Sequence, residues 1–362
     1  MWSAGIPARI PVPKDTRVIR FPGWPFGRAR DSEAHQNQVG WRWGEAFDYT
    51  APIMLSGVTK RFGSKIALDN LDVVIPAGRV TALVGPDGAG KSTTLRLIAG
   101  ALVPTEGRIV VGGLDVVRHT GDVQAHLGFV PSRRLLYSDL TIAENLAFFA
   151  GLYPAEPVAM AERRASLLDL MDLTRFTDRL AGNLSGGMRQ KLALACALQH
   201  DPGVLLMDEP TTGIDPLARR DLWRLFHRLN RDGLTILLST PAMDEATRCH
   251  EVIFMDHGRQ MARGTPTSLL EHAQGRVVAL EATPIALATA VARRFPEVSS
   301  VQPRGDRLHV LLDADASADP SWLASRLQSH GVTVRSIKPV KPTLEDVFVA
   351  LTTSPRAHSK EA

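Results

Sequence analysis

The sequence has little of what marks a secreted, membrane-spanning or nucleic-acid-binding chain. It contains two cysteines, Cys196 and Cys249, which are too few for a disulfide framework and fit a reducing cytosol. No apolar run approaches the roughly 20 residues that span a bilayer, and the first residues lack the apolar core of a signal peptide. The formal net charge of +4 is small for 362 residues, and no basic cluster interleaves with aromatic residues. We therefore expect no nucleic-acid partner, and we expect any membrane role to come through another protein.

The length suggests two domains, preceded by an extension over residues 1–52. This extension is rich in Pro, Gly and Arg, shows no apolar periodicity, and holds four of the six tryptophans: Trp2, Trp24, Trp41 and Trp43. It could be an arm that docks on a partner or a membrane surface. The composition favours a disordered extension, or an over-long start with Met54 as the true initiator.

The chain from Ile53 onwards has globular patterning, organised around one glycine-rich segment. Residues 85–92 read Gly-Pro-Asp-Gly-Ala-Gly-Lys-Ser and fit G-x-x-x-x-G-K-[ST] at every position. The run Val80–Val84, apolar except for Thr81, predicts a buried strand before this segment, and residues 93–99 predict a helix after it, which is the context of a phosphate-binding loop. The alternative is a chance glycine-rich turn before a helix, and the flanking strand argues against it.

Each part of this segment has a physical role in holding phosphate. Glycines let successive backbone N–H groups turn inward around an anion, and the helix N-terminus adds its positive end. Lys91 would reach the β- and γ-phosphates, and the Ser92 hydroxyl would ligate Mg²⁺. The sequence therefore predicts a nucleoside triphosphate with Mg²⁺, and the residues expected to bind it here are Gly85, Pro86, Asp87, Gly88, Ala89, Gly90, Lys91, Ser92 and Thr93.

The elements around the phosphate loop predict an α/β fold with a mostly parallel, doubly wound sheet over residues 53–272. Strands are expected at 54–60, 71–75, 80–84, 204–207, 235–239 and 251–255. Helical patterning dominates from Thr141 to Gln199, where a capping box opens the first helix, and it predicts a helical subdomain over about 138–200. Further helices are expected after Pro216 and near Ala242.

The pattern changes near Gly275. Strands and helices then alternate in the order βαββαβ, which predicts a small ferredoxin-like α+β domain over residues 273–352 and a polar tail over 353–362. The expected elements lie at 276–282, 284–295, 298–302, 308–312, 322–329 and 332–337. No catalytic constellation stands out in this domain.

Asp208 and Glu209 form the second half of the expected nucleotide site. They follow the apolar run Val204–Met207, whose carboxyl end is where ligands bind in open α/β sheets. Asp208 would hold Mg²⁺, and Glu209 would polarise the attacking water and take its proton. An acidic pair at a strand end can also be a solvated loop, and the phosphate loop in the same domain favours the functional interpretation.

The segment Leu184-Ser185-Gly186-Gly187-Met188 resembles the signature motif of ATP-binding cassette (ABC) proteins, whose consensus has Gln, or commonly Met, at the fifth position. The order of phosphate loop, signature and then Val204–Pro210 as the Walker B motif is similar to that family over roughly residues 53–272. Residues 85–91 and the terminal Pro-Thr-Leu-Glu-Asp-Val-Phe at 342–348 resemble drug-exporter ATPases of the daunorubicin-resistance type. The resemblance implies an ATPase subunit on the cytoplasmic face of the cell membrane that drives a separate membrane permease.

The resemblance also implies further ligand contacts. Two such domains pair head to tail in the family, so that each ATP lies between one phosphate loop and the signature of the other subunit. Ser185, Gly186 and Gly187 would then serve the site of a second ABC ATPase. Asp215 would belong to the D-loop, and Phe62 lies where the family has its adenine-stacking aromatic, although an aromatic residue there is more often part of a core.

Two departures from the family pattern concern groups that, in the family, position the attacking water and the γ-phosphate. The family has a Gln after its Gly-aromatic-x-Pro strand end, whereas Ser132 follows Gly128-Phe129-Val130-Pro131 here. It also has a His after the strand that follows Walker B, whereas Thr240 is followed here by Pro241. Ser132 has a shorter reach, and Pro241 has no side-chain donor. Nearby His250 is expected to be structural, and Asp87 is expected to point away from the phosphates.

These features favour an exporter subunit whose own site binds Mg·ATP but hydrolyses it poorly, while its signature completes the site of a partner, preferably in a heterodimer. A fully active homodimeric exporter ATPase and a non-hydrolysing assembly subunit stay open as alternatives. An ABC ATPase acting on ribosomes or DNA is disfavoured, because such proteins usually carry two cassettes or a long coiled coil. The transported substrate does not follow from this sequence, because its contacts lie in the permease.

Overall fold

The computed structural model describes residues 47–132, 136–153, 157–273, 276–313, 316 and 319–353. The four tryptophans of the extension and residues 354–362 lie outside this part, so the expectations about them stay predictions. Phe47 stacks on the His126 imidazole with ring centroids 4.6 Å apart, and the Tyr49 hydroxyl lies 2.6 Å from its Nδ1. Packing therefore begins before Ile53.

The expected parallel sheet is present, with one antiparallel strand added at its edge. Its order is β10-β9-β3-β8-β7-β6, and every neighbouring pair is parallel except β9 with β10. The strands are β3 (Val80–Val84), β6 (Leu127–Val130), β7 (Val204–Asp208), β8 (Thr235–Thr240), β9 (Glu251–Asp256) and β10 (Arg259–Gly264). The carboxyl ends of β3, β7 and β8 thus lie side by side, where a ligand site is expected.

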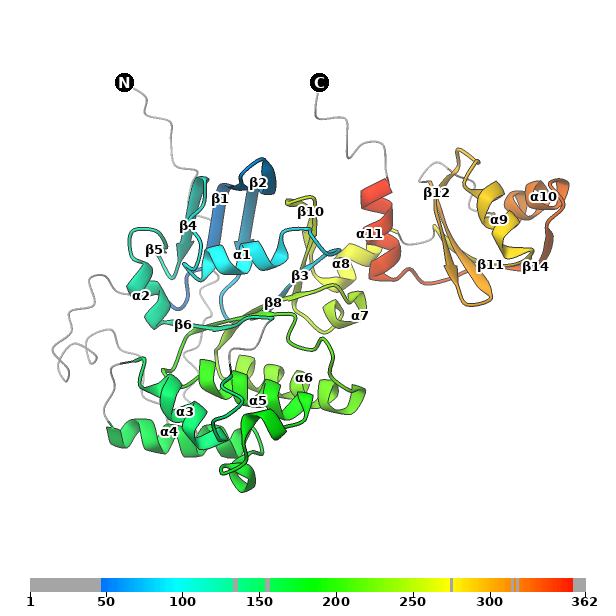
Figure 1. Ribbon diagram of the computed structural model, residues 1–362. Coiled ribbons are helices and arrows are strands. Elements are labelled where there is room, and N and C mark those ends of the chain that lie inside the picture. The colour runs from blue at the N-terminus through cyan, green and yellow to red at the C-terminus, as the bar shows by residue number, and fades with distance from the viewer. Residues whose placement is uncertain are drawn as a thin grey trace, which may run out of the picture. The chain divides into compact units, whose positions relative to one another are not determined.

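A second, antiparallel sheet has the order β2-β1-β4-β5. Its strands are β1 (Ile53–Phe62), β2 (Lys65–Ile75), β4 (Glu106–Val111) and β5 (Leu114–Asp115). The sequence patterning indicated the first two of these strands, and it did not indicate that they leave the parallel sheet. Figure 1 shows this sheet on the α1 side of the parallel sheet.

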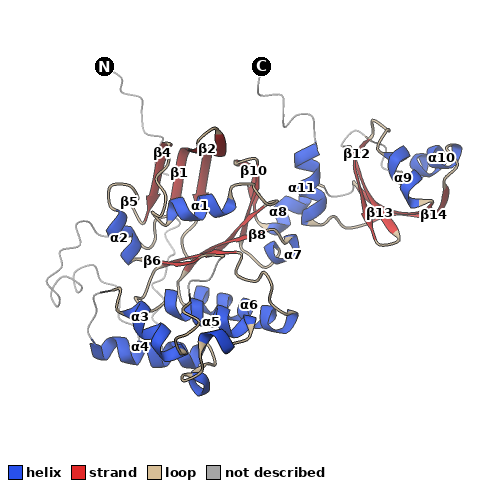
Figure 2. Ribbon diagram, viewed as in Figure 1, coloured by secondary structure: helices blue, strands red, loops and turns tan. Residues whose placement is uncertain are grey.

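The parallel sheet is buried on both faces, and β3 shows how its residues divide between them. Val80, Ala82 and Val84 pack into a core with α5 (Gly186–Ala197) and α6 (Pro216–Arg231). Leu83 packs into a separate core on the other face, with α1 (Lys91–Ile98) and the antiparallel sheet. This alternation explains the continuous apolar runs of the parallel strands. Figures 1 and 2 show α1 on one side of the sheet and α5 and α6 on the other.

The remaining helices of the first domain are α2 (Thr120–Ala125), α3 (Ile142–Ala150), α4 (Pro157–Leu170), α7 (Met243–Ala246) and α8 (Pro266–Glu271). Short 3₁₀ turns lie at Thr174–Phe176 and Ala181–Asn183. The predicted capping box is confirmed, because Thr141 Oγ1 accepts from the Glu144 N–H while the Glu144 carboxylate accepts from the Thr141 N–H. Such a cap contributes about 0.5–2 kcal/mol. In the described part of the chain, no helix is both long and apolar enough to cross a bilayer.

The second domain has the expected βαββαβ order. Its antiparallel sheet runs β12-β13-β11-β14. The elements are β11 (Val277–Thr283), α9 (Ile285–Ala292), β12 (Val298–Arg304), β13 (Arg307–Leu312), α10 (Ser321–Ser329) and β14 (Thr333–Pro339). A final helix, α11 (Leu344–Thr353), returns to the first domain. Its Leu344 and Val347 belong to the core of α5 and α6, and the Phe348 ring lies 5.4 Å from that of Phe254 in β9.

His200, just after α5, is held without charge inside the first domain. Its ring stacks on Tyr153 with centroids 3.7 Å apart, and its Nε2 donates to the Leu127 carbonyl oxygen at 3.2 Å. Burial, together with the nearby Arg163 guanidinium, lowers the pKa of His200 from 6.5 to about 4. The unfolded chain therefore takes up this proton first as the pH falls. Its contribution to stability is complete above the unfolded pKa and is lost progressively as the pH falls towards about 4.

We expect His200→Gln to unfold with a weaker acid dependence than the unchanged chain. The histidine should account for about 2 kcal/mol of the stability lost between about pH 7 and about pH 5, since each unit of pKa separation is worth about 1.4 kcal/mol. Urea unfolding at the two pH values measures this difference. His257→Gln is the control, because that side chain is 91% exposed. Equal acid sensitivity of His200→Gln and the unchanged chain would contradict the prediction.

Candidate functional site

The phosphate loop lies between the end of β3 and the start of α1, as expected. Two of its glycines are required by close packing. A Cβ at Gly85 would lie 2.1 Å from the Met255 carbonyl oxygen. At Gly90, the N-cap of α1, the backbone has φ +100° and a Cβ would lie 2.6 Å from Leu68 Cδ2. Neither position accepts a side chain, so the tight loop depends on glycine at both.

Lys91 is the first residue of α1 and is 4% exposed. Its Nζ donates to the carbonyl oxygens of Gly85 at 2.7 Å and Pro86 at 2.8 Å, so the ammonium lies inside the loop. Burial lowers the pKa of Lys91, although Glu209, Asp87 and Asp208 act in the opposite direction. The loop thus holds a partly desolvated ammonium, to which the oxygens of an incoming polyphosphate would offer anionic partners.

Asp208 ends β7 and is 1% exposed. One carboxylate oxygen, Oδ1, accepts from Ser92 Oγ at 2.8 Å and from Ser239 Oγ at 2.6 Å. The structure therefore brings together Ser92 and Asp208, the two residues predicted to hold the metal ion.

The other oxygen of Asp208 tests whether this pair fits Mg²⁺. Asp208 Oδ2 is buried and makes no hydrogen bond to the described residues, and an orphaned buried carboxylate oxygen is suited to a cation. Among the described residues, no three His, Cys, Asp or Glu side chains gather closely enough to hold a metal ion. Mg²⁺ is commonly held by one or two protein ligands together with phosphate oxygens and water. Ser92 and Asp208 fit that pattern.

Glu209, the predicted catalytic residue, has a left-handed backbone with φ +50°. Its N–H donates to the Ser239 carbonyl oxygen at 3.1 Å and to Ser239 Oγ at 3.0 Å. Its Oε2 accepts from Thr212 Oγ1 at 3.2 Å. A left-handed conformation in a non-glycine residue costs of order 1–3 kcal/mol and persists only where the surroundings hold it. Here Ser239 and Thr212 supply those contacts.

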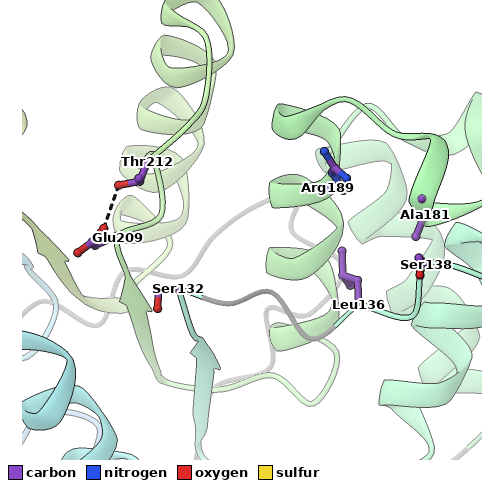
Figure 3. Close-up of a pocket in the computed structure, with 8 residues that line it drawn as sticks. Ser132, Leu136, Ser138, Ala181, Arg189, Glu209 and Thr212 are labelled. Atoms are coloured by element: carbon purple, nitrogen blue, oxygen red, sulfur yellow. Dashed lines mark hydrogen bonds between the residues drawn. The ribbon is translucent and has the colours of Figure 1, made fainter.

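A cavity of about 460 Å³ opens beside Glu209. Figure 3 shows Ser132, Glu209 and Thr212 on one side of it, and Leu136, Ser138, Ala181 and Arg189 on the facing side, with Arg189 coming from α5. Ser132 lines this cavity together with Glu209. The family has a glutamine at this position, so the short serine hydroxyl stands here in place of the longer amide side chain.

The second departure lies at the end of β8. Pro241 is exposed and directly follows Thr240, whose Oγ1 accepts from the Ala242 N–H at 3.0 Å. His250 lies elsewhere, because its Nδ1 accepts from the N–H of Val80 at 3.1 Å. Val80 begins β3, and the phosphate loop follows the opposite end of that strand. His250 is thus structural, as expected, and does not replace the missing imidazole.

Phe62 and Asp87 both face solvent. Phe62 ends β1, is 48% exposed, and has Lys60 Nζ 5.1 Å from its ring centroid. This exposure excludes the alternative of a core aromatic, and adenine stacking stays a prediction. Asp87 is also exposed, which agrees with a side chain that points away from the loop interior.

The signature residues open α5, on the other side of the sheet from α1 (Figure 1). Ser185 is the N-cap, and its Oγ accepts from the Met188 N–H at 3.2 Å. A Cβ at Gly187 would lie 2.8 Å from the Cβ of Ala218 in α6, so this glycine also has a packing role. The structure therefore keeps this chain's signature apart from its own phosphate loop.

Asp215 has a role inside the chain. Its Oδ1 accepts from the N–H groups of Leu217 at 3.1 Å and Ala218 at 3.0 Å, so it caps α6. Contact of Asp215 with nucleotide across a dimer stays a prediction.

Sequence reasoning missed Ser239, which bridges Asp208 and Glu209. The sequence could have indicated this residue, because Ser239 ends the predicted strand 235–239 and Asp208 follows the predicted strand 204–207. In the structure these two strands pair in parallel, with Asp208 opposite Ser239. A polar residue that ends the strand next to a Walker B strand lies at the same sheet edge as the acidic pair. Thr212 and Arg189 were also missed, since the contact of Thr212 with Glu209 depends on loop geometry and the position of Arg189 across the cavity depends on the packing of α5.

Two family models match the chain. The model described as ABC transporter matches residues 68–212, which include the phosphate loop, the signature and the acidic pair. The model described as the C-terminal domain of ATP-binding protein DrrA1-3-like proteins matches residues 264–352, which contain the second domain and all but the last residue of α11.

Curated relatives share most of this chain. The probable multidrug ABC transporter ATP-binding protein YbhF of Escherichia coli (strain K12) is 40% identical over 305 residues, 83% of this chain and 52% of YbhF. The chain thus spans about half the length of that relative. The Nod factor export ATP-binding protein I of Rhizobium sp. (strain N33) is 37% identical over 83% of this chain and 96% of its own length. The daunorubicin resistance ATP-binding protein DrrA2 of Streptomyces coeruleorubidus is 34% identical over 83% and 94%.

Two solved structures that are similar to this chain are likewise ATP-binding components of the ABC type. An ATP-binding subunit of an ABC transporter aligns with a TM-score of 0.56 and 29% identity, over 61% of this chain and 93% of that one. A dimeric ATP-binding cassette in a post-hydrolysis state with ADP and Pi aligns with a TM-score of 0.54 and 27% identity, over 59% and 98%. The chain therefore belongs to the ABC family of transporter ATP-binding proteins and carries a DrrA-like C-terminal domain.

Proposed function

We propose that this chain is the ATP-binding subunit of an ABC exporter, that its own site binds Mg·ATP and hydrolyses it slowly, and that its signature completes the site of a second ABC ATPase. The observation that carries the proposal is the pair of positions beside Glu209. Ser132 lines the cavity where the family has an amide, and Pro241 follows β8 where the family has an imidazole. The groups that bind nucleotide are present, and two groups that would position water and the γ-phosphate are absent.

The chain's own residues would act as follows. The N–H groups of the phosphate loop and the Lys91 ammonium would bind the phosphates, and Ser92 with Asp208 would hold the metal ion. Bound Mg²⁺ supplies charge neutralisation at the phosphate oxygens. The Glu209 carboxylate, held by Ser239 and Thr212, would orient the attacking water and accept its proton. Phe62 would stack on the adenine.

The partners follow from the same proposal. The relatives are named for export of drugs, Nod factors and daunorubicin resistance, so a membrane permease is the partner we infer. The chain would lie at the inner face of the cell membrane through that permease. The intact Lys91, Asp208 and Glu209 support one alternative, a homodimer in which both sites hydrolyse ATP.

ATP turnover by the purified chain tests the proposal. We expect a low rate for the chain alone, and a rate at least about tenfold higher after reconstitution with a permease and a complete second cassette ATPase, which corresponds to about 1.4 kcal/mol of barrier. Reconstitution with the permease alone is the control. Brisk turnover by the chain alone, unchanged by the second ATPase, would replace the proposal with the active homodimer.

A further inference from the structure

A buried carboxylate with no assigned role lies behind the acidic pair. Glu245 belongs to the short helix α7 and is 2% exposed. Its Oε1 accepts from Thr211 Oγ1 at 2.5 Å, and its Oε2 accepts from Thr240 Oγ1 at 3.0 Å. Both threonines are themselves buried, at 3% and 2% exposure. The Arg219 Nε lies 3.7 Å from Glu245 Oε1 and makes no closer hydrogen bond to the described residues.

The two threonines belong to the two segments that hold the candidate catalytic residue, Thr211 to the loop after β7 and Thr240 to the end of β8. Thr211 lies two residues after Glu209, and the next residue, Thr212, donates to the Glu209 carboxylate at 3.2 Å. Thr240 directly follows Ser239, which accepts the Glu209 N–H and donates to Asp208. Glu245 therefore ties the loop after β7 to the end of β8, immediately behind the residues that carry the chemistry.

A role in stability alone accounts poorly for this arrangement. Burying a carboxylate costs free energy that its partners only offset, and an apolar residue of similar size often serves stability as well or better. What a charged acceptor adds is geometry, since its two oxygens fix two hydroxyl donors at set positions. Glu209 has a left-handed backbone that its surroundings must hold.

We propose that Glu245 is a positioning residue, which acts through Thr211 and Thr240 to hold the loop 209–215 so that the Glu209 carboxylate faces the cavity. The inference rests on the proposed function in one respect, because it takes Glu209 as the group that activates water. The proposed positioning includes the last part of this loop, the turn at 213–215, which leads into the Asp215 cap of α6.

Amide hydrogen exchange on the full chain tests the positioning without any need for turnover. Three amides of the loop are hydrogen-bonded, since Glu209 donates to Ser239, Thr212 to Glu209 and Ile214 to Thr211. We expect Glu245→Ala to speed exchange in residues 209–215 by about 10- to 100-fold, the range that follows from losing a hydrogen bond to a charged group. Exchange in β3 and β9 should stay unchanged.

A matched control separates this effect from general loss of a buried acid. Glu251 in β9 has a side chain 12% exposed and accepts from Arg263 Nε at 2.5 Å, away from the loop. Glu251→Ala should leave exchange at 209–215 unchanged. If Glu245→Ala does not fold, Thr211→Val removes one hydroxyl and keeps the side-chain shape, and it should give the same local effect. Unchanged exchange at 209–215, or a rise spread evenly over the whole first domain, would overturn the proposal.

ATP turnover is the second test of the proposal. The Glu209→Gln variant shows whether the measured turnover comes from this chain's own site. If Glu209→Gln stops hydrolysis, we expect Glu245→Ala to lower kcat at least about tenfold while KM for ATP changes less than about twofold, as for a group that acts only on the chemical step. Thr211→Val added to Glu245→Ala should lower kcat no further, because the two act through one contact. Unchanged kcat would overturn the inference. If Glu209→Gln has no effect, turnover reports the partner's site, and the exchange result decides.

Discussion

Replacing Ser185 by arginine is expected to abolish most ATP turnover of the proposed complex between this chain and a complete ABC ATPase, whereas Glu209→Gln in this chain should cost little. Ser185 opens α5, and its signature lies apart from this chain's own phosphate loop. In a head-to-tail pair it would face the γ-phosphate held by the partner. An arginine there would fill the space needed for that phosphate, while Glu209 would serve the site that, in the proposal, Ser132 and Pro241 weaken.

The measurement is the steady-state ATPase rate of the reconstituted complex with each variant. The control must account for the lost helix cap, because Ser185 Oγ also accepts from the Met188 N–H. Thr265→Arg removes a cap of the same kind from α8, where Thr265 accepts from the Ser268 N–H, at a cost of about 0.5–2 kcal/mol. It should leave turnover unchanged. A complex that loses its activity with Glu209→Gln and keeps it with Ser185→Arg would reverse the proposed asymmetry.

Lys91→Ala is expected to weaken ATP binding by about one to two orders of magnitude, since a charge-assisted contact is worth roughly 1.5–3 kcal/mol. The Lys91 Nζ lies inside the loop on the carbonyl oxygens of Gly85 and Pro86, at the place where phosphate oxygens would meet it. Titration of the purified chain with labelled Mg·ATP measures the change. Lys65→Ala, at the exposed start of β2, is the control. Unchanged affinity in Lys91→Ala would mean that the phosphate loop is not the nucleotide site.

The parts of the fold that the sequence predicted are those where local pattern and burial agree. Val204–Met207 is a continuous apolar run, and Val80–Val84 is apolar except for Thr81, because both faces of the parallel sheet are covered. The phosphate loop could be read from its glycines, since Gly85 and Gly90 tolerate no side chain. The βαββαβ order of the second domain could be predicted, because segments with a strand pattern and segments with a helix pattern follow one another there, each of an ordinary length for its type.

The parts that were missed depend on contacts between distant segments. β4 and β5 are short and extend the antiparallel sheet, where β4 pairs with β1 and β5 pairs with β4, so nothing local distinguishes them from loops. In the sequence, Glu245 looks like an ordinary acidic residue at the start of a helix. Its position depends on contacts with Thr211, in the loop after β7, and with Thr240, at the end of β8. The left-handed backbone conformation of Glu209 could not be predicted from the sequence, because the position holds a glutamate and not the glycine that usually indicates such a conformation.

The return of α11 to the first domain has a consequence for how the chain is made. Residues 272–343 separate α8 from α11, yet Leu344 and Val347 belong to the core around α5 and α6. Synthesis at about 5–20 residues per second leaves several seconds in which the first domain has emerged from the ribosome without them. During that interval the apolar surface around Phe254 lacks the Phe348 ring that covers it in the finished fold. Translation of the second domain therefore sets when the first can finish folding.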